Sequence, residues 1–148
     1  MLKNSLLNLF ERDLNKLKEE IKFFIDENDI WLTPGDIKNS PGNLCLHVCG
    51  NLKHFIGATL GNTGYVRERD KEFSLKNVPK VELVENIDET LTIVKKVISE
   101  LDGDIFNKNY PINVFGKDMT TEYFLIHLTT HLNYHLGQIN YLRRVLID

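Results

Sequence analysis

The chain has 148 residues, of which 42% are hydrophobic and 26% charged, and its formal net charge is −3. This length and composition predict one soluble globular domain spanning residues 1–148. The slight acidity and the lack of a Lys/Arg-rich run exclude nucleic acid and anionic membranes as expected partners, and no apolar stretch approaches the ~20 residues of a membrane helix. Charged residues follow the N-terminus too closely for a secretory signal, so we expect a cytoplasmic protein.

The first segment has the pattern of an amphipathic helix. Apolar residues recur at alternating spacings of three and four from Leu7 to Phe24, which is typical of a helix that packs along one seam. We expect this helix to run from about Leu2 to Glu27. Trp31 lies beyond it and is expected to cover one end of the helical core.

A second helix is predicted from its start signal. Ser40 can cap the N-terminus and Pro41 suits the first helical position, so the helix should run from there to about Leu60. His47 and His54 are seven residues apart and share an azimuth to within about 20°. The arc that carries them is polar but small-sided, so another backbone or a ligand can approach it.

The two cysteines, Cys45 and Cys49, also fall in this helix. They are four residues apart, and a disulfide across one helical turn is geometrically awkward. Two cysteines make no disulfide framework. We therefore expect both thiols to be reduced and buried.

The stretch from Gly61 to Pro79 has no clear period and is predicted to be a long connection. It contains a run of charged residues from Arg67 to Glu72. Long connections in compact domains are often functional. Arg67 and Arg69 could hold the carboxylate of a cofactor, or they could simply be solvated loop charges.

A third helix is predicted from the apolar seam between Leu83 and Leu101, with a stop at Gly103. Residues 105–117 are expected to be irregular, with room for a short hairpin. Asp118 or Thr120 then caps a fourth helix that extends to Leu146.

The fourth helix carries three histidines, His127, His131 and His135, at successive spacings of four. Such neighbours lie roughly 40° apart on one face of a helix. The apolar stripe of this helix includes the position of His135, so we expect His135 to face the core, His131 its edge and His127 a side seam. Four helices with a long crossover between the second and third predict an all-α four-helix bundle, in which those two helices run parallel.

These histidines have the spacing of a metal site. A pair four residues apart can present two imidazoles to one ion, and His47 or His54 on a facing helix can add the third ligand. Three neutral ligands leave coordination positions for water or substrate, as in catalytic sites. The alternative is that the histidines only form hydrogen bonds inside the bundle, with partners such as Asn51, Thr130, Tyr134 or Gln138.

Two stretches resemble a known superfamily: Ser-Pro-Gly-Asn-Leu-Cys-Leu-His-Val-Cys-Gly-Asn-Leu-Lys-His-Phe-Ile-Gly at 40–57 and His-Leu-Asn-Tyr-His-Leu-Gly-Gln-Ile at 131–139. With the helix order and the crossover, they are similar to the DinB-like, YfiT-like metal-binding bundles that include bacillithiol S-transferases. The resemblance covers essentially the whole chain. It implies an up-down-down-up bundle, commonly a homodimer, with one divalent ion on His47, His131 and His135.

The resemblance implies a metal-dependent, thiol-dependent S-transferase or hydrolase that acts on small molecules, with a low-molecular-weight thiol as a possible cofactor. Three imidazoles suit zinc, nickel or iron as the ion. A second hypothesis is a non-enzymatic metal-binding or stress-related bundle that acts through its dimer or a ligand pocket. A third is a purely structural bundle without metal. The sequence leaves the roles of His54, His127, Arg67 and Arg69 open.

Overall fold

The computed structural model describes residues 1–147, and it confirms that the fold is all-helical. Within this range the extended backbone pairs only in an isolated antiparallel bridge between Asn109 and Thr120. Four long helices make up most of the chain: α1 (Leu2–Lys22), α2 (Pro41–Leu52), α5 (Lys80–Glu100) and α6 (Thr121–Leu146). The shorter elements are η1 (Glu27–Trp31), η2 (Lys53–Ala58), α3 (Thr59–Gly61), α4 (Arg69–Ser74) and η3 (Gly103–Asn107).

The first helix is shorter than its apolar seam suggested. α1 ends at Lys22 rather than near Glu27, and a 3-10 turn follows in which the Asp26 side chain accepts a hydrogen bond from the backbone N–H of Asn28 at 2.9 Å. Trp31 closes this turn and is 8% exposed. A Cβ at Gly42 would lie 2.7 Å from the indole ring. The tryptophan therefore covers the start of α2.

The predicted cap of the second helix is present, because Ser40 Oγ accepts a hydrogen bond from the backbone N–H of Asn43 at 3.1 Å. Helical backbone continues from α2 through η2 and α3 as far as Gly61, close to the expected end. η2 is a π turn, which is wider than an α-helical turn. η2 begins at Lys53, so His54 lies in the π turn and not in the regular helix for which its azimuth was predicted.

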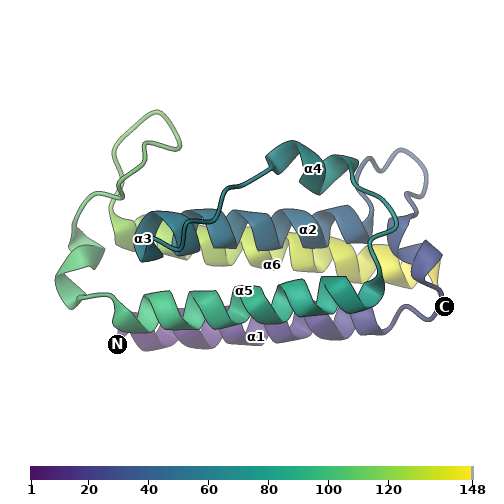
Figure 1. Ribbon diagram of the computed structural model, residues 1–148, viewed down its shortest axis with the longest axis horizontal. Helices are drawn as coiled ribbons and strands as arrows, with labels where there is room; N and C mark the ends of the chain where they lie inside the picture. The colour runs from purple at the N-terminus through teal and green to yellow at the C-terminus, as the bar shows by residue number, and fades with distance from the viewer. Residues whose placement is uncertain (148) are drawn as a thin grey trace.

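The long helices pack along one another (Figure 1). α1 contacts α5 and α6, and α2 contacts α6 and α5. The connection after α3 crosses over to the other end of α2, and its short helix α4 packs on α2. The predicted long connection is therefore partly helical and lies against the core. None of the helices within residues 1–147 is long and apolar enough to cross a bilayer.

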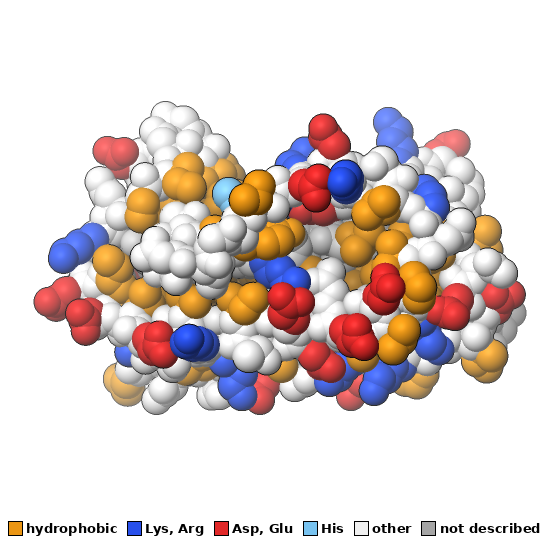
Figure 2. Space-filling model, in the orientation of Figure 1, with side chains coloured by type: hydrophobic (Ala, Val, Ile, Leu, Met, Phe, Trp, Pro, Cys, Tyr) orange, Lys and Arg blue, Asp and Glu red, His pale blue; other side chains and the backbone are white. Residues whose placement is uncertain are grey.

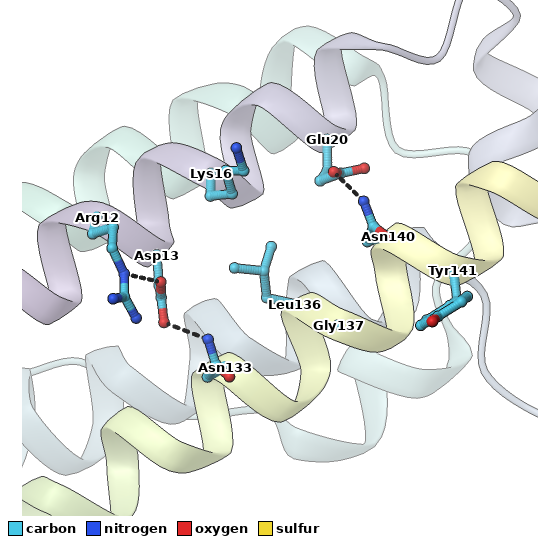
Figure 3. A pocket seen from close by; sticks show the side chains of 9 residues that line it. All are labelled: Arg12, Asp13, Lys16, Glu20, Asn133, Leu136, Gly137, Asn140 and Tyr141. Carbon is cyan, nitrogen blue, oxygen red and sulfur yellow. Dashed lines mark hydrogen bonds and ion pairs between the residues drawn. The ribbon is translucent and has the colours of Figure 1, made fainter.

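Two polar contacts fix the register of α1 against α6 (Figure 3). Asn133 Nδ2 donates to Asp13 Oδ2 at 3.0 Å. About two helical turns further along both helices, Asn140 Nδ2 donates to Glu20 Oε1 at 2.8 Å. Asp13 is 5% exposed and Glu20 is 3% exposed. Leu136 lies between the two pairs. Buried carboxylates are costly when unpaired, so these contacts disfavour any sliding of one helix along the other.

Candidate metal centre

Three histidines from two helices converge on one point. His47 is on α2, and His131 and His135 are one turn apart on α6. The Nε2 atom of His131 lies 3.3 Å from that of His47 and 3.1 Å from that of His135. One ring nitrogen from each residue lies within 4.8 Å of the other two, an arrangement that could hold a metal ion. These are the three residues that the resemblance implied.

The other two histidines lie outside this group. The ring of His127 packs edge-on to Phe115 at 4.9 Å and parallel to Phe124 at 5.8 Å, so it belongs to an aromatic cluster. His54 packs against Phe55 at 4.7 Å, and its Nδ1 is buried without a hydrogen-bond partner among residues 1–147. The structure therefore assigns His47, and not His54, to the face opposite His131 and His135.

The environment of His131 and His135 favours neutral imidazoles. His47 is 7% exposed, and the other two are half-buried. Burial lowers the pKa of His131 to about 3, with further lowering by the neighbouring His135 and His47. Burial also lowers the pKa of His135. Neutral imidazole is the form that binds metal ions, so little protonation competes with an ion at these two residues. On the face of the molecule drawn in Figure 2, only a small area of histidine surface, in pale blue, reaches the solvent.

Hydrogen bonds at the far side of two rings determine which nitrogen carries the proton. Oε1 of Glu72 lies 3.0 Å from Nδ1 of His47. An ionised carboxylate can only accept, so Nδ1 donates and the Nε2 of His47 presents a lone pair. Oε1 of Gln138 lies 2.7 Å from Nδ1 of His135, with the same result.

Lone pairs of His47 and His135 thus both point towards Nε2 of His131. One proton on His131 could satisfy only one of these two contacts, at 3.3 Å and 3.1 Å. A cation would satisfy all three nitrogens at once. Three imidazoles suit zinc, nickel or iron. The donor set therefore fits a divalent transition metal ion.

Glu72 is the residue of the site that the sequence did not reveal. It lies on α4 in the crossover and is 6% exposed. Arg67 donates to it through Nε and a terminal nitrogen, each at 2.9 Å. Burial raises the pKa of Glu72, but the hydrogen bonds from His47 and Arg67 and the charge of Arg67 outweigh burial and lower it. Glu72 is therefore ionised and holds the ring of His47 in place.

The crossover is fastened so that Glu72 reaches His47. Asn43 Nδ2 donates to the backbone carbonyls of Glu72 and Leu75, each at 2.9 Å, and Lys76 Nζ donates to Asn43 Oδ1 at 2.5 Å. Gly50 of α2 leaves room for the carboxylate of Glu72. From the sequence, the small side chains on this arc of α2 were expected to let another backbone or a ligand approach. This pattern is the one sequence feature that indicated where α4 packs.

The other side chains considered from the sequence have different roles. Arg67 is paired with Glu72 through Nε and one terminal nitrogen, so it is not simply a solvated loop charge. Arg69 lies over the ring of Phe73 at 5.2 Å. Thr130 donates to the carbonyl of His127 on its own helix at 2.7 Å. Among the hydrogen-bond partners suggested for the histidines, Gln138 does form such a bond, with His135.

Asn51 and Tyr134 were the remaining suggestions. Asn51 is 7% exposed, and its Oδ1 has no hydrogen-bond partner within residues 1–147. The ring of Tyr134 packs edge-on to that of His135 at 5.3 Å. Both expected free cysteines, Cys45 and Cys49, are buried. The histidine cluster is thus supported by a carboxylate, an amide and aromatic rings.

Comparison with curated proteins finds no match to this chain. A family model described as "Protein of unknown function (DUF1572)" matches residues 4–148. Because this match covers almost the whole sequence, including all the residues of the histidine cluster, the chain belongs to the DUF1572 family.

Proposed function

We propose that this chain is a DinB-like four-helix bundle of one domain with up-down-down-up topology, which binds one divalent metal ion on His47, His131 and His135. The sequence resemblance supports the bundle type. So do the pairwise packing of α1, α2, α5 and α6 and the course of the crossover in Figure 1. The observation that carries the metal proposal is the convergence of three ring nitrogens within 4.8 Å.

The proposed activity is that of a metal-dependent S-transferase or hydrolase, with a low-molecular-weight thiol as the cofactor of the transferase. A bound divalent ion supplies Lewis-acid chemistry, which lowers the pKa of a thiol or water and makes it nucleophilic at neutral pH. The chain contributes orientation: Glu72 and Gln138 each hold the Nδ1 proton of a histidine. Glu72 acts as a positioning residue rather than a general base, because its two oxygens are committed to His47 and Arg67.

Metal content of the untagged protein, measured by mass spectrometry, tests the site. We expect about one zinc, nickel or iron ion per chain in the wild type and its loss in His131→Ala. His127→Ala is the matched control, because His127 is on the same helix but outside the cluster, and it should retain the ion. A wild type that takes up none of these metals, or a His131→Ala variant that binds as well as the wild type, would refute the metal centre.

A non-enzymatic role is the second candidate. The ion pair between Glu72 and Arg67 favours it, because the carboxylate next to His47 is then not available as a general base. A screen of small electrophiles against a panel of thiols separates the two. Turnover that depends on metal and vanishes in His47→Ala rejects the non-enzymatic role.

The proposal includes a homodimer, with neither nucleic acid nor membrane as a partner. Light scattering that shows only monomer would contradict the dimer.

A further inference from the structure

A cavity of about 690 Å³ adjoins the histidine cluster on the side of His135. His135 and Gln138 line it, so the cavity and the candidate metal centre share two residues. The opposite wall is the loop 36–39 together with Leu44 at the start of α2. This volume falls within the range of about 300–1,000 Å³ that is typical of sites for small molecules.

The walls of this cavity are largely apolar and aromatic. Ile37 on the loop is 48% exposed, and Tyr134 and Tyr141 on α6 are 64% and 68% exposed. Scattered exposed side chains of this kind are ordinary, but here three of them line one hollow. They offer the kind of surface on which a flat or branched hydrocarbon body can pack.

The charges around the cavity argue against a phosphorylated ligand. Its lining includes one acidic residue, Asp36, and one basic residue, Lys38, whose opposite charges offset each other. Phosphate groups are usually held by several basic side chains or by backbone N–H groups at a helix N-terminus. At the start of α2, which also borders the cavity, Ser40 accepts hydrogen bonds from the backbone N–H groups of Asn43 and Leu44, so these two groups are not free to hold a phosphate.

The loop wall is held in shape at both ends. It follows Trp31, which is 8% exposed, and precedes Ser40, which is fully buried. Within it the backbone N–H of Ile37 donates to the carbonyl of Pro34 at 3.1 Å, and Gly35 adopts φ +56°, a conformation that favours glycine. Ile37 is therefore presented by a tight turn, and the cavity is formed before any ligand arrives.

We propose that this cavity binds the apolar body of a small substrate, aromatic or branched aliphatic, while the reactive end of that substrate lies at the histidine cluster. Nucleotides and sugar phosphates are not expected ligands. The inference rests on the proposed function, since it assigns a substrate class to the same site. It adds Ile37 and Tyr141 as residues that determine specificity.

A pair of hydroxamates tests the inference on the zinc-loaded full-length protein. Acetohydroxamate and 2-naphthohydroxamate share a metal-binding head and differ in their apolar body. We expect the naphthyl compound to bind about tenfold more tightly or better, because its rings leave water for the cavity. Tyr141→Glu and Ile37→Lys should each remove this advantage. Tyr123→Glu is the matched control, since Tyr123 is 56% exposed on the same helix and does not line the cavity.

Calorimetric titration with zinc alone separates failure of this inference from failure of the proposed function. If zinc binds normally to all three variants and the naphthyl compound has no advantage, or keeps it in both cavity variants, the substrate class is wrong and the metal centre stands. If zinc does not bind the wild type, the proposed function fails. Titration of the metal-free protein with 1-anilinonaphthalene-8-sulfonate then tests the cavity alone: binding that Tyr141→Glu abolishes supports an apolar site, and binding that it leaves unchanged overturns it.

Discussion

Gly50 and Glu72 fit together so closely that a Cβ at position 50 would lie 1.9 Å from Oε2 of the glutamate. Glu72 is held from the other side by two hydrogen bonds from Arg67 and by Nδ1 of His47. The side chain cannot move away without breaking one of these contacts. A glycine on α2 thus determines whether a carboxylate from the crossover can reach a histidine of the cluster.

Gly50→Ala should therefore destabilise the protein, against the usual trend. Alanine in place of glycine within a helix normally stabilises by about 0.5–1 kcal/mol. At position 50 we expect a loss of about 1–3 kcal/mol, because the added methyl group displaces Glu72. Gly137→Ala is the matched control: a Cβ there would meet nothing within 4 Å, so the usual gain should appear. Urea unfolding measures both, and equal effects in the two variants would contradict the tight fit at Gly50.

Glu72→Gln should weaken metal binding and stability together. The change leaves the guanidinium of Arg67, 11% exposed, without its carboxylate. Loss of one partner of a buried ion pair costs about 3 kcal/mol, and loss of a carboxylate behind a ligating histidine lowers metal affinity by about tenfold or more. Calorimetry with zinc and urea unfolding of the metal-free protein give the two values.

The matched control is Glu68→Gln. Glu68 is exposed and pairs with Lys71 at 2.8 Å on the surface of the same crossover. Surface ion pairs of this kind contribute about 0–1 kcal/mol, so stability should change little and zinc affinity not at all. If Glu72→Gln binds zinc as tightly as Glu68→Gln does, Glu72 does not orient His47.

The stability of the metal-free protein should depend on pH through His131. Its pKa is lowered from the ordinary 6.5 to about 3 by burial and by the neighbouring imidazoles. Between these pH values the unfolded chain binds more protons at this site than the folded chain does, so stability falls as the pH falls from about 6.5 towards 3. His131→Ala removes this contribution. Its unfolding free energy should fall less steeply than that of the wild type between about pH 6.5 and pH 5, above the ordinary range of carboxyl groups. Parallel curves for the two chelator-treated proteins would show that His131 makes no such contribution.

Asn43→Ala should loosen the crossover. The variant loses the two hydrogen bonds from Asn43 Nδ2 to the carbonyls of Glu72 and Leu75, and a buried group left unsatisfied costs about 1–3 kcal/mol. Compared with the wild type, amide hydrogen exchange in Asn43→Ala should become faster in α4 and stay unchanged in α1. Asn8→Ala, on the exposed face of α1, should leave both rates unchanged. Unaltered protection of α4 in Asn43→Ala would mean that other contacts hold the crossover.

Local patterns predicted the helices because each is set by short-range rules. Ser40 and Thr120 both cap the helices that follow them, accepting from the backbone of Asn43 and Tyr123. The expected placement of His135 in the core was less accurate. Leu136 is buried and His135 is half-buried, because the buried stripe drifts round the helix along its length.

The supporting residues of the cluster could not be predicted in the same way. Nothing in the charged run from Arg67 to Glu72 distinguishes the one acidic residue that becomes buried. Its burial follows from the docking of α4 on α2, through Asn43 and Gly50, which are far away in the sequence. The choice between His47 and His54 was also open, and the π turn η2, which contains His54, has no sequence signature that we could identify.

The histidine cluster joins distant parts of the chain, because His47 and His131 are 84 positions apart in the sequence. A chain in which α5 and α6 have formed but α2 has not docked offers only the pair one turn apart on α6. The complete set exists only after the first and last thirds of the sequence have met. Occupancy of the centre by an ion would therefore report that folding is finished, and an ion added during refolding should favour the last step, the closure of α2 upon α6.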